Sequence, residues 1–390
     1  MMMVSSHFFS KKLFSILALV IGLSYSVFAR ARGPRVEVVC PFSPIPVKIA
    51  GDRVLAYELH VTNFDKVPLR MTRVDIYSDQ QESQFSQSIL APDLLGIMVE
   101  VGANGAENQP DLIAPGRRAI LFMWIKIALN KPFPQTLHHR IVFHSDNGSQ
   151  ASEDAGNAAV LNDFLVSVSR RAVPILNPPF HNGVWVAGDG PANDSPHRRS
   201  FLAIDGQVHA PERFASDWVK VGSNGDSKHG NSRNEDYWDF GEPVLAVTNG
   251  EVTDLKDGIA DNVPHVPPKE ITLDNILGNY VILKIAPSTF VTYAHLKNGS
   301  IQVALHQHIQ QGVQIGLVGD TGQATAPHLH LEVTNGNSGL ESEGIPFVFS
   351  HFTDLGPGTT YENDKHPSKP RQDILPQKDE VVAFPDTNKY

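Results

Sequence analysis

The sequence predicts an all-β protein made of two domains, and three observations indicate this fold class. The apolar segments are short, and clusters of Gly, Pro, Asn and Asp separate them, as turns separate strands. Several segments alternate apolar and polar residues with a period of two, which is typical of strands with one buried face. Between residues 34 and 172 no segment repeats its apolar residues with the helical period. The 390 residues give room for two cores.

The first 31 residues have the pattern of a signal peptide. Lys11 and Lys12 form a positive start, and Leu13–Phe28 is an apolar stretch without charge. Ala29-Arg30-Ala31 is a small-x-small cleavage site, with Val27-Phe28-Ala29 as a competitor. The apolar stretch is short for a bilayer span, which needs about 20 residues, although an uncleaved anchor is the alternative. We therefore expect export, periplasmic or secreted, with no stable membrane span after cleavage.

Residues 34–172 are expected to form an immunoglobulin-like β-sandwich, because short alternating strands follow one another at the spacing of that fold. The candidate strands are Val54–Thr62, Leu69–Tyr77, Ala119–Ala128, Arg140–His144 and Asp163–Ser169. No set of catalytic residues is recognisable in this region. His138 and His139 do not make a metal site, because adjacent strand residues point to opposite faces. We expect an accessory or spacer role.

A linker with several prolines, Pro174–Phe180, opens a second β domain assigned to residues 173–354. Asn249-Gly250 predicts a hairpin turn between two strands, since this pair tolerates positive φ. The candidate strands are Val244–Val247, Glu251–Leu255, Asn279–Ile285, Phe290–Leu296 and Gln314–Val318. Two polar insertions, 222–239 and 257–269, interrupt them. Residues 355–390 are polar and rich in proline, and we expect a flexible tail.

The composition narrows the class of partners. Hydrophobic residues make up 41% of the chain and charged residues 19%, which fits a folded protein. The formal net charge of −10 argues against a general nucleic-acid-binding role. Cys40 is the single cysteine, so an internal disulfide is impossible, and we expect it to be a small buried residue.

The segment Gly319–Val333, GDTGQATAPHLHLEV, carries the clearest chemical signal. On a strand His328, His330 and Glu332 share one face, and two imidazoles on a rigid strand can hold a divalent metal. The pair alone is weak, because 17 histidines produce about one His-x-His by chance. His306-Gln307-His308 is such a pair without a similar setting. The surrounding sequence must therefore supply the specificity.

Further short segments of the second domain occur in a definite order around this motif. They are RFASDW (213–218), GEPVLAV (241–247), NGEV (249–252), GNYV (278–281), YAHL (293–296), GDTG (319–322) and PHLH (327–330). Together they resemble the lysostaphin/LytM-type zinc metalloendopeptidases, which have the duplicated hybrid motif and cleave peptide bridges of bacterial peptidoglycan. The resemblance covers about Phe201–Phe352 and implies a compact antiparallel β peptidase domain.

The resemblance also implies roles for individual residues. In that family an upstream His, an Asp four residues later and the second His of His-x-His bind one zinc ion. Carried onto matching positions, Asp217 and His330 become metal ligands, while His328 and His295 act in catalysis. Two imidazoles and a carboxylate leave zinc an open position for water, whose pKa the metal can bring near 7.

One position departs from the family pattern. Arg213 stands four residues before Asp217, where the first ligand is expected, and a guanidinium cannot bind zinc. His209 has the same strand parity as Asp217 but lies eight residues away. His197 precedes a predicted strand, and a hairpin at Asp205-Gly206 would bring it level with Arg213. We favour His197 slightly over His209 as the first ligand, and the case that neither serves stays open.

Three functions follow from these observations. The leading one is an exported zinc metalloendopeptidase that hydrolyses peptidoglycan peptides. The alternative is a catalytically degenerate domain that binds cell wall or regulates another hydrolase, and its motive is Arg213, which could repel a metal or bind an acidic group. The third is a zinc-bearing domain acting on a substrate other than peptidoglycan.

Overall fold

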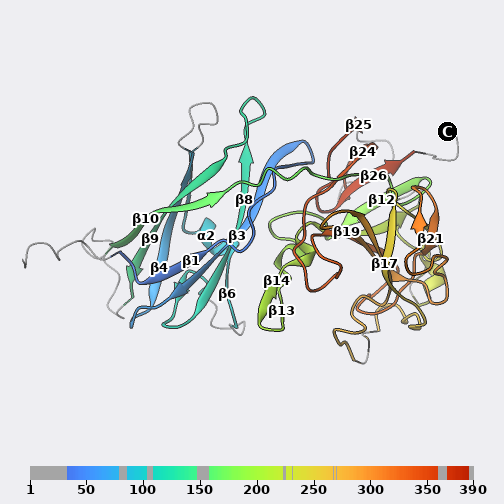
Figure 1. Cartoon of the computed structure of the whole chain (residues 1–390), viewed down its shortest axis with the longest axis horizontal. Helices are drawn as coiled ribbons and strands as arrows, with labels where there is room; N and C mark the ends of the chain where they lie inside the picture. The colour runs from blue at the N-terminus through green and yellow to red at the C-terminus, as the bar shows by residue number, and fades with distance from the viewer. Residues whose placement is uncertain are drawn as a thin grey trace, which may run out of the picture.

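The computed structural model describes residues 33–78, 86–102, 109–146, 158–222, 225–230, 232–266, 268, 270–358 and 367–385. Within them the chain is nearly all β and forms two domains that lie side by side (Figure 1), which confirms the all-β prediction. The signal peptide predicted for residues 1–31 lies outside the described residues. A search of the described residues finds no helix long and apolar enough to cross a membrane.

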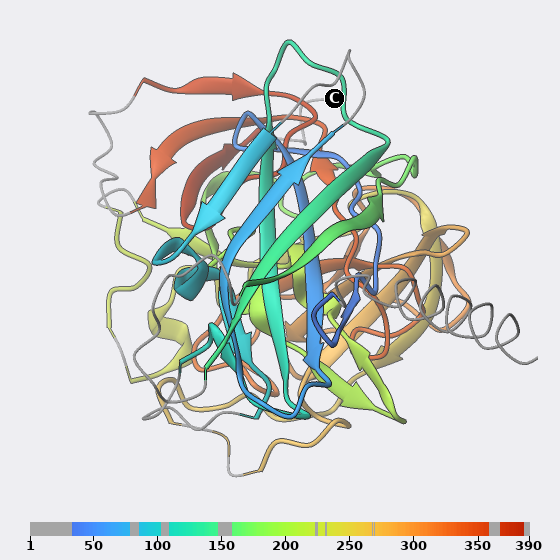
Figure 2. The same cartoon turned by 90° about the vertical axis from the view of Figure 1, so that its left-hand side faces the viewer.

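The N-terminal domain consists of two antiparallel sheets that enclose one apolar core (Figure 2). The strand order is β1–β3–β8–β6 in the first sheet, with β2 paired to β3, and β10–β9–β4–β5 in the second, with β7 paired to β4. The bounds are β1 (Val36–Val39), β2 (Val47–Ile49), β3 (Asp52–Asn63), β4 (Leu69–Tyr77), β5 (Ser86–Leu90), α2 (Asp93–Ile97), β6 (Met98–Glu100), β7 (Leu112–Ile113), β8 (Arg118–Ile127), β9 (Thr136–Ser145) and β10 (Ala158–Ser167). The immunoglobulin-like assignment of this sandwich stays a prediction.

Strand β3 is buried on both of its faces. The odd-numbered side chains from Leu55 to Val61 fill the core of the sandwich. Val54 and Ala56 belong instead to the core of the second domain, and Glu58 and His60, on the same face, are 1% and 5% exposed. Because side chains alternate along a strand, β3 serves two cores at once. Within the middle of the strand, residues 54–61, Glu58 and His60 are the charged or ionisable exceptions to an apolar run, which is typical of a strand covered on both sides.

The second domain is built on one long sheet of order β20–β17–β18–β19–β22–β15–β12–β26–β24–β25. Its strands are β12 (Gly183–Gly188), β15 (Ser216–Val221), β17 (Gly250–Lys256), β18 (Asn279–Ala286), β19 (Thr289–Leu296), β20 (His308–Ile309), β22 (Leu329–Thr334), β24 (Phe352–Pro357), β25 (Lys369–Arg371) and β26 (Glu380–Phe384). Smaller elements are β11 (Ile175–Leu176), η2 (His197–Arg199), β13 (Leu202–Ile204), β14 (Gln207–His209), η3 (Pro211–Phe214), η4 (Asn234–Asp236), β16 (Pro243–Leu245), β21 (Gln314–Leu317) and β23 (Val348–Phe349), where η marks a 3-10 helix.

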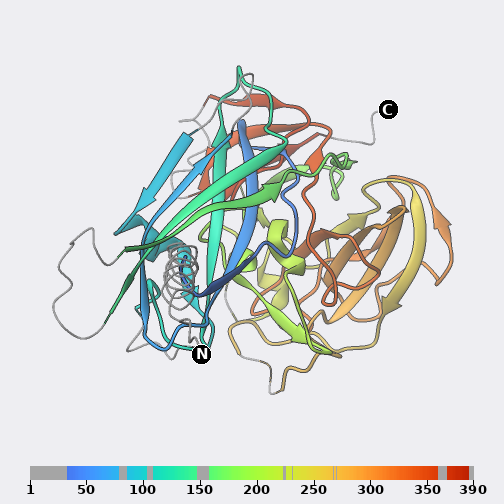
Figure 3. The same ribbon diagram turned by 60° about the vertical axis from the view of Figure 1, so that its left-hand side comes forward.

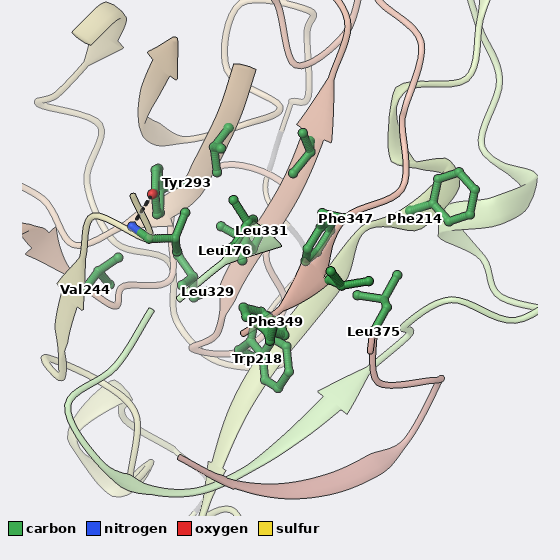
Figure 4. Close-up of a cluster of buried hydrophobic side chains, with 14 of the residues drawn as sticks. Leu176, Phe214, Trp218, Val244, Tyr293, Leu329, Leu331, Phe347, Phe349 and Leu375 are labelled. Carbon is green, nitrogen blue, oxygen red and sulfur yellow. Dashed lines mark hydrogen bonds between the residues drawn. The ribbon is translucent and has the colours of Figure 1, made fainter. Parts of the chain in front are cut away.

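The apolar face of this sheet packs into the core shown in Figure 4. Trp218, Leu329 and Leu331 are completely buried there. The hydroxyl of Tyr293 accepts a hydrogen bond from the backbone N–H of Val247 at 2.9 Å, so the one polar atom of this buried ring is satisfied. Leu329 and Leu331 fix the face on which the alternate residues of β22 lie, which is the opposite one.

Two hairpins were predicted by turn chemistry, with different outcomes. The Asp205-Gly206 hairpin is confirmed, because β13 pairs with β14 and both turn residues have positive φ, 49° and 79°. The hairpin around Asn249-Gly250 is wrong, because β16 pairs with β21 and β17 pairs with β18 and β20. Partners distant in sequence bind both strands there, and local turn propensity does not decide the pairing.

The expected flexible tail also differs from the structure. Within residues 355–390, the described part 367–385 contains β25 and β26. Strand β26 lies between β12 and β24 in the long sheet, with Val381 and Val382 completely buried. The tail prediction is therefore wrong for these residues, because a single strand of five residues within a polar stretch was enough to complete the sheet.

The N-terminal domain packs on the second domain through the outer face of β3 and β8 (Figure 3). Val47 and Ile49 of β2 are also members of the second domain's core. Ile49 forms a bridge with Leu375, and the N–H of Leu375 donates to the carbonyl of Lys48 at 2.9 Å. The two domains therefore share apolar packing and main-chain hydrogen bonds.

Candidate metal centre

Three of the residues predicted to bind metal come together in the second domain. Asp217 of β15 and His330 of β22 are direct partners in the sheet register, and Nδ1 of His330 lies 3.0 Å from Oδ1 of Asp217. His197 approaches from η2, with its Nε2 3.5 Å from Oδ2 of Asp217. One donor atom from each of the three residues lies within 4.8 Å of the other two. The structure therefore brings the sheet pair and His197 into one cluster.

The donor set is compatible with a zinc ion. Tetrahedral zinc with bonds of about 2.0–2.1 Å holds its ligand atoms about 3.4 Å apart. The separations of 3.0 Å from His330 to Oδ1 of Asp217 and 3.5 Å from His197 to Oδ2 are close to that value, and one donor atom from each residue lies within 4.8 Å of the others. Two imidazoles and one carboxylate would leave the cation a net charge of +1 and a fourth position for water.

His328 lies beside this cluster, on the same face of the chain as His330. Its Nε2 is 3.5 Å from Oδ2 of Asp217, and its Nδ1 is 2.8 Å from the carbonyl oxygen of Ala326. Leu329 and Leu331 point into the core, so the predicted division of faces along this strand is confirmed. A carbonyl oxygen only accepts, so Nδ1 of His328 carries a proton and Nε2 is the ring nitrogen near the cluster.

His295 reaches the same place from β19 through an irregularity in that strand. The register between β18 and β19 shifts by one residue between Tyr293 and Leu296. Tyr293 and Leu296 both point into the core although they are three residues apart, so the extra residue turns His295 to the opposite face. His295 has a positive φ of 63°, which marks the strain of this bulge. Its ring centroid is 4.8 Å from that of His328.

Hydrogen bonds orient the rings of His295 and His197. Nδ1 of His295 donates to the carbonyl of Thr321 at 2.7 Å, and Nδ1 of His197 donates to the carbonyl of Asp189 at 3.0 Å. Nε2 is therefore the second ring nitrogen that each imidazole can offer to a metal or a proton. Burial, together with the neighbouring histidines, lowers the pKa of His295 well below its ordinary value, so this ring is neutral at physiological pH.

Glu332 lies next to His330 on the side away from Asp217. Its carboxylate is completely buried, and Oε2 lies 3.7 Å from Nε2 of His330. Neither Nε2 of His330 nor either oxygen of Glu332 has a hydrogen-bond partner in the described part of the chain. A small movement that makes this hydrogen bond would satisfy all three atoms and direct Nδ1 toward the metal position. In the sequence, the only sign of this role is that Glu332 follows His330 by two residues and so lies on the same face of the strand.

The charge of Asp217 is stabilised where it stands. Burial raises the pKa of its carboxyl, but the three surrounding histidines lower it more, and the pKa lies below the ordinary value. Burial lowers the pKa of His330, but Asp217 and Glu332 outweigh it and raise the pKa well above the ordinary value. In the metal-free protein the two carboxylates therefore stabilise a proton on His330. A bound cation would replace that proton.

His209 does not join the cluster. It lies at the end of β14 and pairs with Leu202 in a separate two-stranded sheet. The predicted equal parity of His209 and Asp217 fails because η3 (Pro211–Phe214) interrupts the strand between them. Among the described residues, the group of potential ligands contains His197 and omits His209.

Arg213 is occupied elsewhere. It is 2% exposed, and its guanidinium binds the carboxylates of Glu58 and Glu343 and donates to the carbonyl of Gly344 at 2.8 Å. Glu58 belongs to the N-terminal domain. The side chain at the usual first-ligand position therefore joins the two domains, and sequence reasoning within the second domain had no means of finding its partner.

The two polar insertions meet beside the segment that leads to His328. The N–H groups of Asn262 and His265 donate to the carbonyls of Asp320 and Thr325, at 2.6 and 2.8 Å. The insertions contact each other where the hydroxyl of Tyr237 lies 2.8 Å from Nε2 of His265. They therefore support the Gly-rich turn before the histidine strand.

Comparison with known proteins gives one family match. Residues 238–341 match the model of peptidase family M23. The chain is 37% identical to the cell division protein DipM of Caulobacter vibrioides over 93 residues. This matched length is 24% of this chain and 12% of that protein. It is 41% identical to the peptidoglycan DD-endopeptidase ShyA of Vibrio cholerae over 56 residues, and this match covers 14% of this chain and 13% of that protein. The chain thus matches only a small part of the length of these relatives.

The solved structures that the chain matches include two peptidase domains. The catalytic domain of the antimicrobial peptidase lysostaphin from Staphylococcus simulans is 22% identical, with a TM-score of 0.23, and the match covers 41% of this chain and 86% of that one. The catalytic domain of a mutant of the prophage-encoded M23 protein EnpA from Enterococcus faecalis is 19% identical, with a TM-score of 0.24, and covers 45% and 93%. At these scores the likeness carries no argument about function.

Proposed function

We propose that this chain, whose residues 238–341 form a peptidase family M23 domain, is an exported zinc metalloendopeptidase that hydrolyses peptide bonds in peptidoglycan. The observation that carries the proposal is the position of His197. It places a second imidazole beside Asp217 and His330 from a turn 16 residues before Arg213, which supports a ligand set of two imidazoles and a carboxylate despite the altered position. Export rests on the signal-peptide pattern of residues 1–31.

His197, Asp217 and His330 would hold the zinc ion, which supplies a water molecule made acidic enough to attack at neutral pH. Asp217 offers its two carboxylate oxygens between the imidazoles of His197 and His330. The carbonyl of Asp189 orients His197 through Nδ1, and Glu332 is placed to orient His330 through Nε2.

His295 and His328 are the groups that would move protons. Both rings carry a proton on Nδ1, held by the carbonyls of Thr321 and Ala326, so Nε2 is the atom at which each ring would take up or release a proton. A neutral imidazole of this kind can accept a proton from the attacking water and return it to the leaving amine. The deep burial of His295 keeps its ring neutral and excludes bulk water from this side of the site.

The alternative is a degenerate domain that binds cell wall or regulates another hydrolase. The position of Arg213 in the structure no longer supports it. It depended on a positive charge of Arg213 at the metal position. Arg213 is instead neutralised by Glu58 and Glu343. We therefore retain the hydrolase as the proposal and treat the binding module as an outcome of the test.

The test uses the mature chain without residues 1–31. We expect about one zinc per chain by elemental analysis and release of fragments from purified peptidoglycan, but no cleavage of unrelated peptides. His330→Ala should abolish both metal and hydrolysis. His308→Ala is the matched control, since His308 belongs to the other His-x-His pair and is exposed, so it should behave as wild type.

Two outcomes would overturn the proposal. Hydrolysis by a fully metal-free preparation would show that zinc is not needed. A zinc-free protein that still binds peptidoglycan without cutting it would favour the binding module. Cleavage of unrelated peptides in place of peptidoglycan would keep the zinc peptidase and change its substrate class.

A further inference from the structure

Glu58 of the N-terminal domain lies between two arginines of the second domain. Its carboxylate binds the guanidinium groups of Arg198 and Arg213, and all three side chains are at most 2% exposed. Nη2 of Arg213 also lies 2.6 Å from Oε2 of Glu343. Two guanidinium groups and two carboxylates therefore balance one another at the domain boundary, largely out of contact with water.

Arg198 extends from η2 of the second domain into the N-terminal domain. Besides the bond to Glu58, its Nη2 donates to the carbonyls of Tyr57 at 2.9 Å and Met123 at 3.3 Å. These carbonyls belong to β3 and β8, the two strands whose outer face covers the second domain. The guanidinium plane is thus fixed by a carboxylate and two main-chain oxygens of the sandwich.

Residues on either side of Arg198 make similar contacts. The side-chain amide of Asn193 donates to the carbonyl of Phe122 at 2.8 Å. Nη2 of Arg199 donates to the carbonyl of Gly96 at 2.6 Å. The segment from Asn193 to Arg199 is therefore anchored on the N-terminal domain at several points.

His197 directly precedes Arg198 in the same three-residue 3-10 helix. Such a helix is too short to be stable by its own hydrogen bonds. Asp217 and His330, in contrast, are held by neighbouring strands of the long sheet. The distance between His197 and the other two potential ligands therefore depends on contacts that hold η2 in place.

We infer that Glu58 is a positioning residue for the metal ligand His197, so that the N-terminal domain completes the metal site of the second domain. The inference rests on the proposed function in that it takes His197 as a ligand. Glu58 does not touch the metal position: it holds Arg198, and Arg198 holds the turn that presents His197.

The charges decide what happens when Glu58 changes. Glu58→Gln keeps the size of the side chain and one acceptor oxygen but removes the negative charge shared by Arg198 and Arg213. One buried positive charge is then left without a counter-charge, and the arginine that has no second carboxylate is the one destabilised. Arg213 keeps Glu343, whereas Arg198 keeps only the carbonyls of Tyr57 and Met123, so Arg198 is the one that moves, and η2 moves with it.

The experiment compares zinc affinity in the full mature chain, measured by competition with a chelator. We expect Glu58→Gln to weaken zinc binding about 10- to 100-fold, as changes behind a ligand do elsewhere, and to alter the visible spectrum of the cobalt-substituted protein. Arg198→Lys keeps the charge but loses the planar fork, and should weaken binding in the same direction, so it decides the matter if the first variant does not fold.

Ile49→Ala is the matched control. Ile49 is 3% exposed in the same domain interface, but its partner is Leu375 and it has no bond to η2. We expect this variant to lower the thermal unfolding temperature while zinc affinity stays within about threefold of wild type. Unchanged zinc affinity in a folded Glu58→Gln variant would overturn the inference, as would unchanged affinity in Arg198→Lys where Glu58→Gln does not fold, or an equal loss of affinity in Ile49→Ala.

A metal-free measurement separates this inference from the proposed function. Amide hydrogen exchange of residues 195–200 in the apo protein should become faster in Glu58→Gln and stay unchanged in Ile49→Ala. If wild type binds no zinc at all, the proposed function fails and the role of Glu58 at a metal ligand fails with it. If wild type binds zinc and cuts peptidoglycan but Glu58→Gln exchanges and binds like wild type, only the inference fails.

Discussion

Two parts of the candidate metal site are built in different ways. Asp217 and His330 stand opposite each other on adjacent strands, with Trp218, Leu329 and Leu331 buried behind them. His197 stands on a single turn whose contacts cross to another domain. The second domain's own core holds the two strands in place, whereas contacts with the N-terminal domain hold the turn in place. A ligand can thus move along the sequence as long as another part of the molecule fixes its new place.

The largest effect should come from the sheet side. Asp217→Asn keeps the shape but removes the charge that three histidines surround. We expect zinc to be lost and hydrolysis to fall by more than about 10³-fold, since the metal contributes several kcal/mol to transition-state stabilisation. Elemental analysis and fragment release check this. Asp205→Asn, in the exposed β13–β14 turn, should leave both quantities unchanged.

The second prediction asks whether the ligand can be moved back. Arg213→His in a His197→Ala background restores the family pattern in sequence. We expect no recovery of zinc binding, because position 213 points toward Glu58 and Glu343. The change also leaves Glu58 without one partner, which should lower the free energy of unfolding by about 3–5 kcal/mol. Recovery of zinc binding would show that η3 can rearrange and that the two ligand positions are interchangeable.

A smaller effect is expected behind the sheet ligand. Glu332→Gln keeps an acceptor near Nε2 of His330 but removes the charge that stabilises the ring. We predict a loss of zinc affinity of about 10-fold, less than that of Glu58→Gln, with little change in unfolding temperature. An effect equal to that of Glu58→Gln would mean that the sheet ligand and the turn ligand need the same degree of outside support. Wild-type affinity would contradict the role given to Glu332.

The smallest effect concerns the pH dependence of the free energy of unfolding, and it arises from His139 in the sandwich and not from the metal site. Burial lowers the pKa of His139 to about 4, and its neutral ring accepts from the hydroxyl of Tyr57 at 2.7 Å. The unfolded chain protonates this group below its ordinary pKa of about 6.5, so the folded state loses stability as pH falls from 6.5 toward 4. His139→Gln should reduce that loss by about 2 kcal/mol in urea unfolding at pH 7 and pH 4.5. An unchanged slope would show that His139 does not titrate differently in the two states.

Several elements of the fold could be predicted because their signals are local. Alternation placed β4 at Leu69–Tyr77 and divided β22 into a histidine face and a leucine face. The Asp205-Gly206 turn was predictable from the tolerance of these residues for positive φ. The Asn249-Gly250 turn and the tail were not, because distant strands decided the pairing of β16 and β26.

The sequence also contained a signal of the domain interface that alternation alone does not explain. In β8 the run Ala119–Ile127 is almost wholly apolar, with Ile120 and Phe122 buried on the face opposite the sandwich core. Such a run indicates a strand covered on both sides. It predicts that something packs on the sandwich, but it does not identify the second domain as that partner.

The sequence by itself determined the all-β class, the second domain's motifs and the pair Asp217 and His330, because strand period and motif order act over short distances. Only the tertiary structure decided that His197 joins that pair and that His209 does not. It also placed Glu58 against Arg198 and Arg213, 140 and 155 residues away. A side chain's partners across such separations depend on how whole sheets pack, and no local pattern in the chain encodes that arrangement.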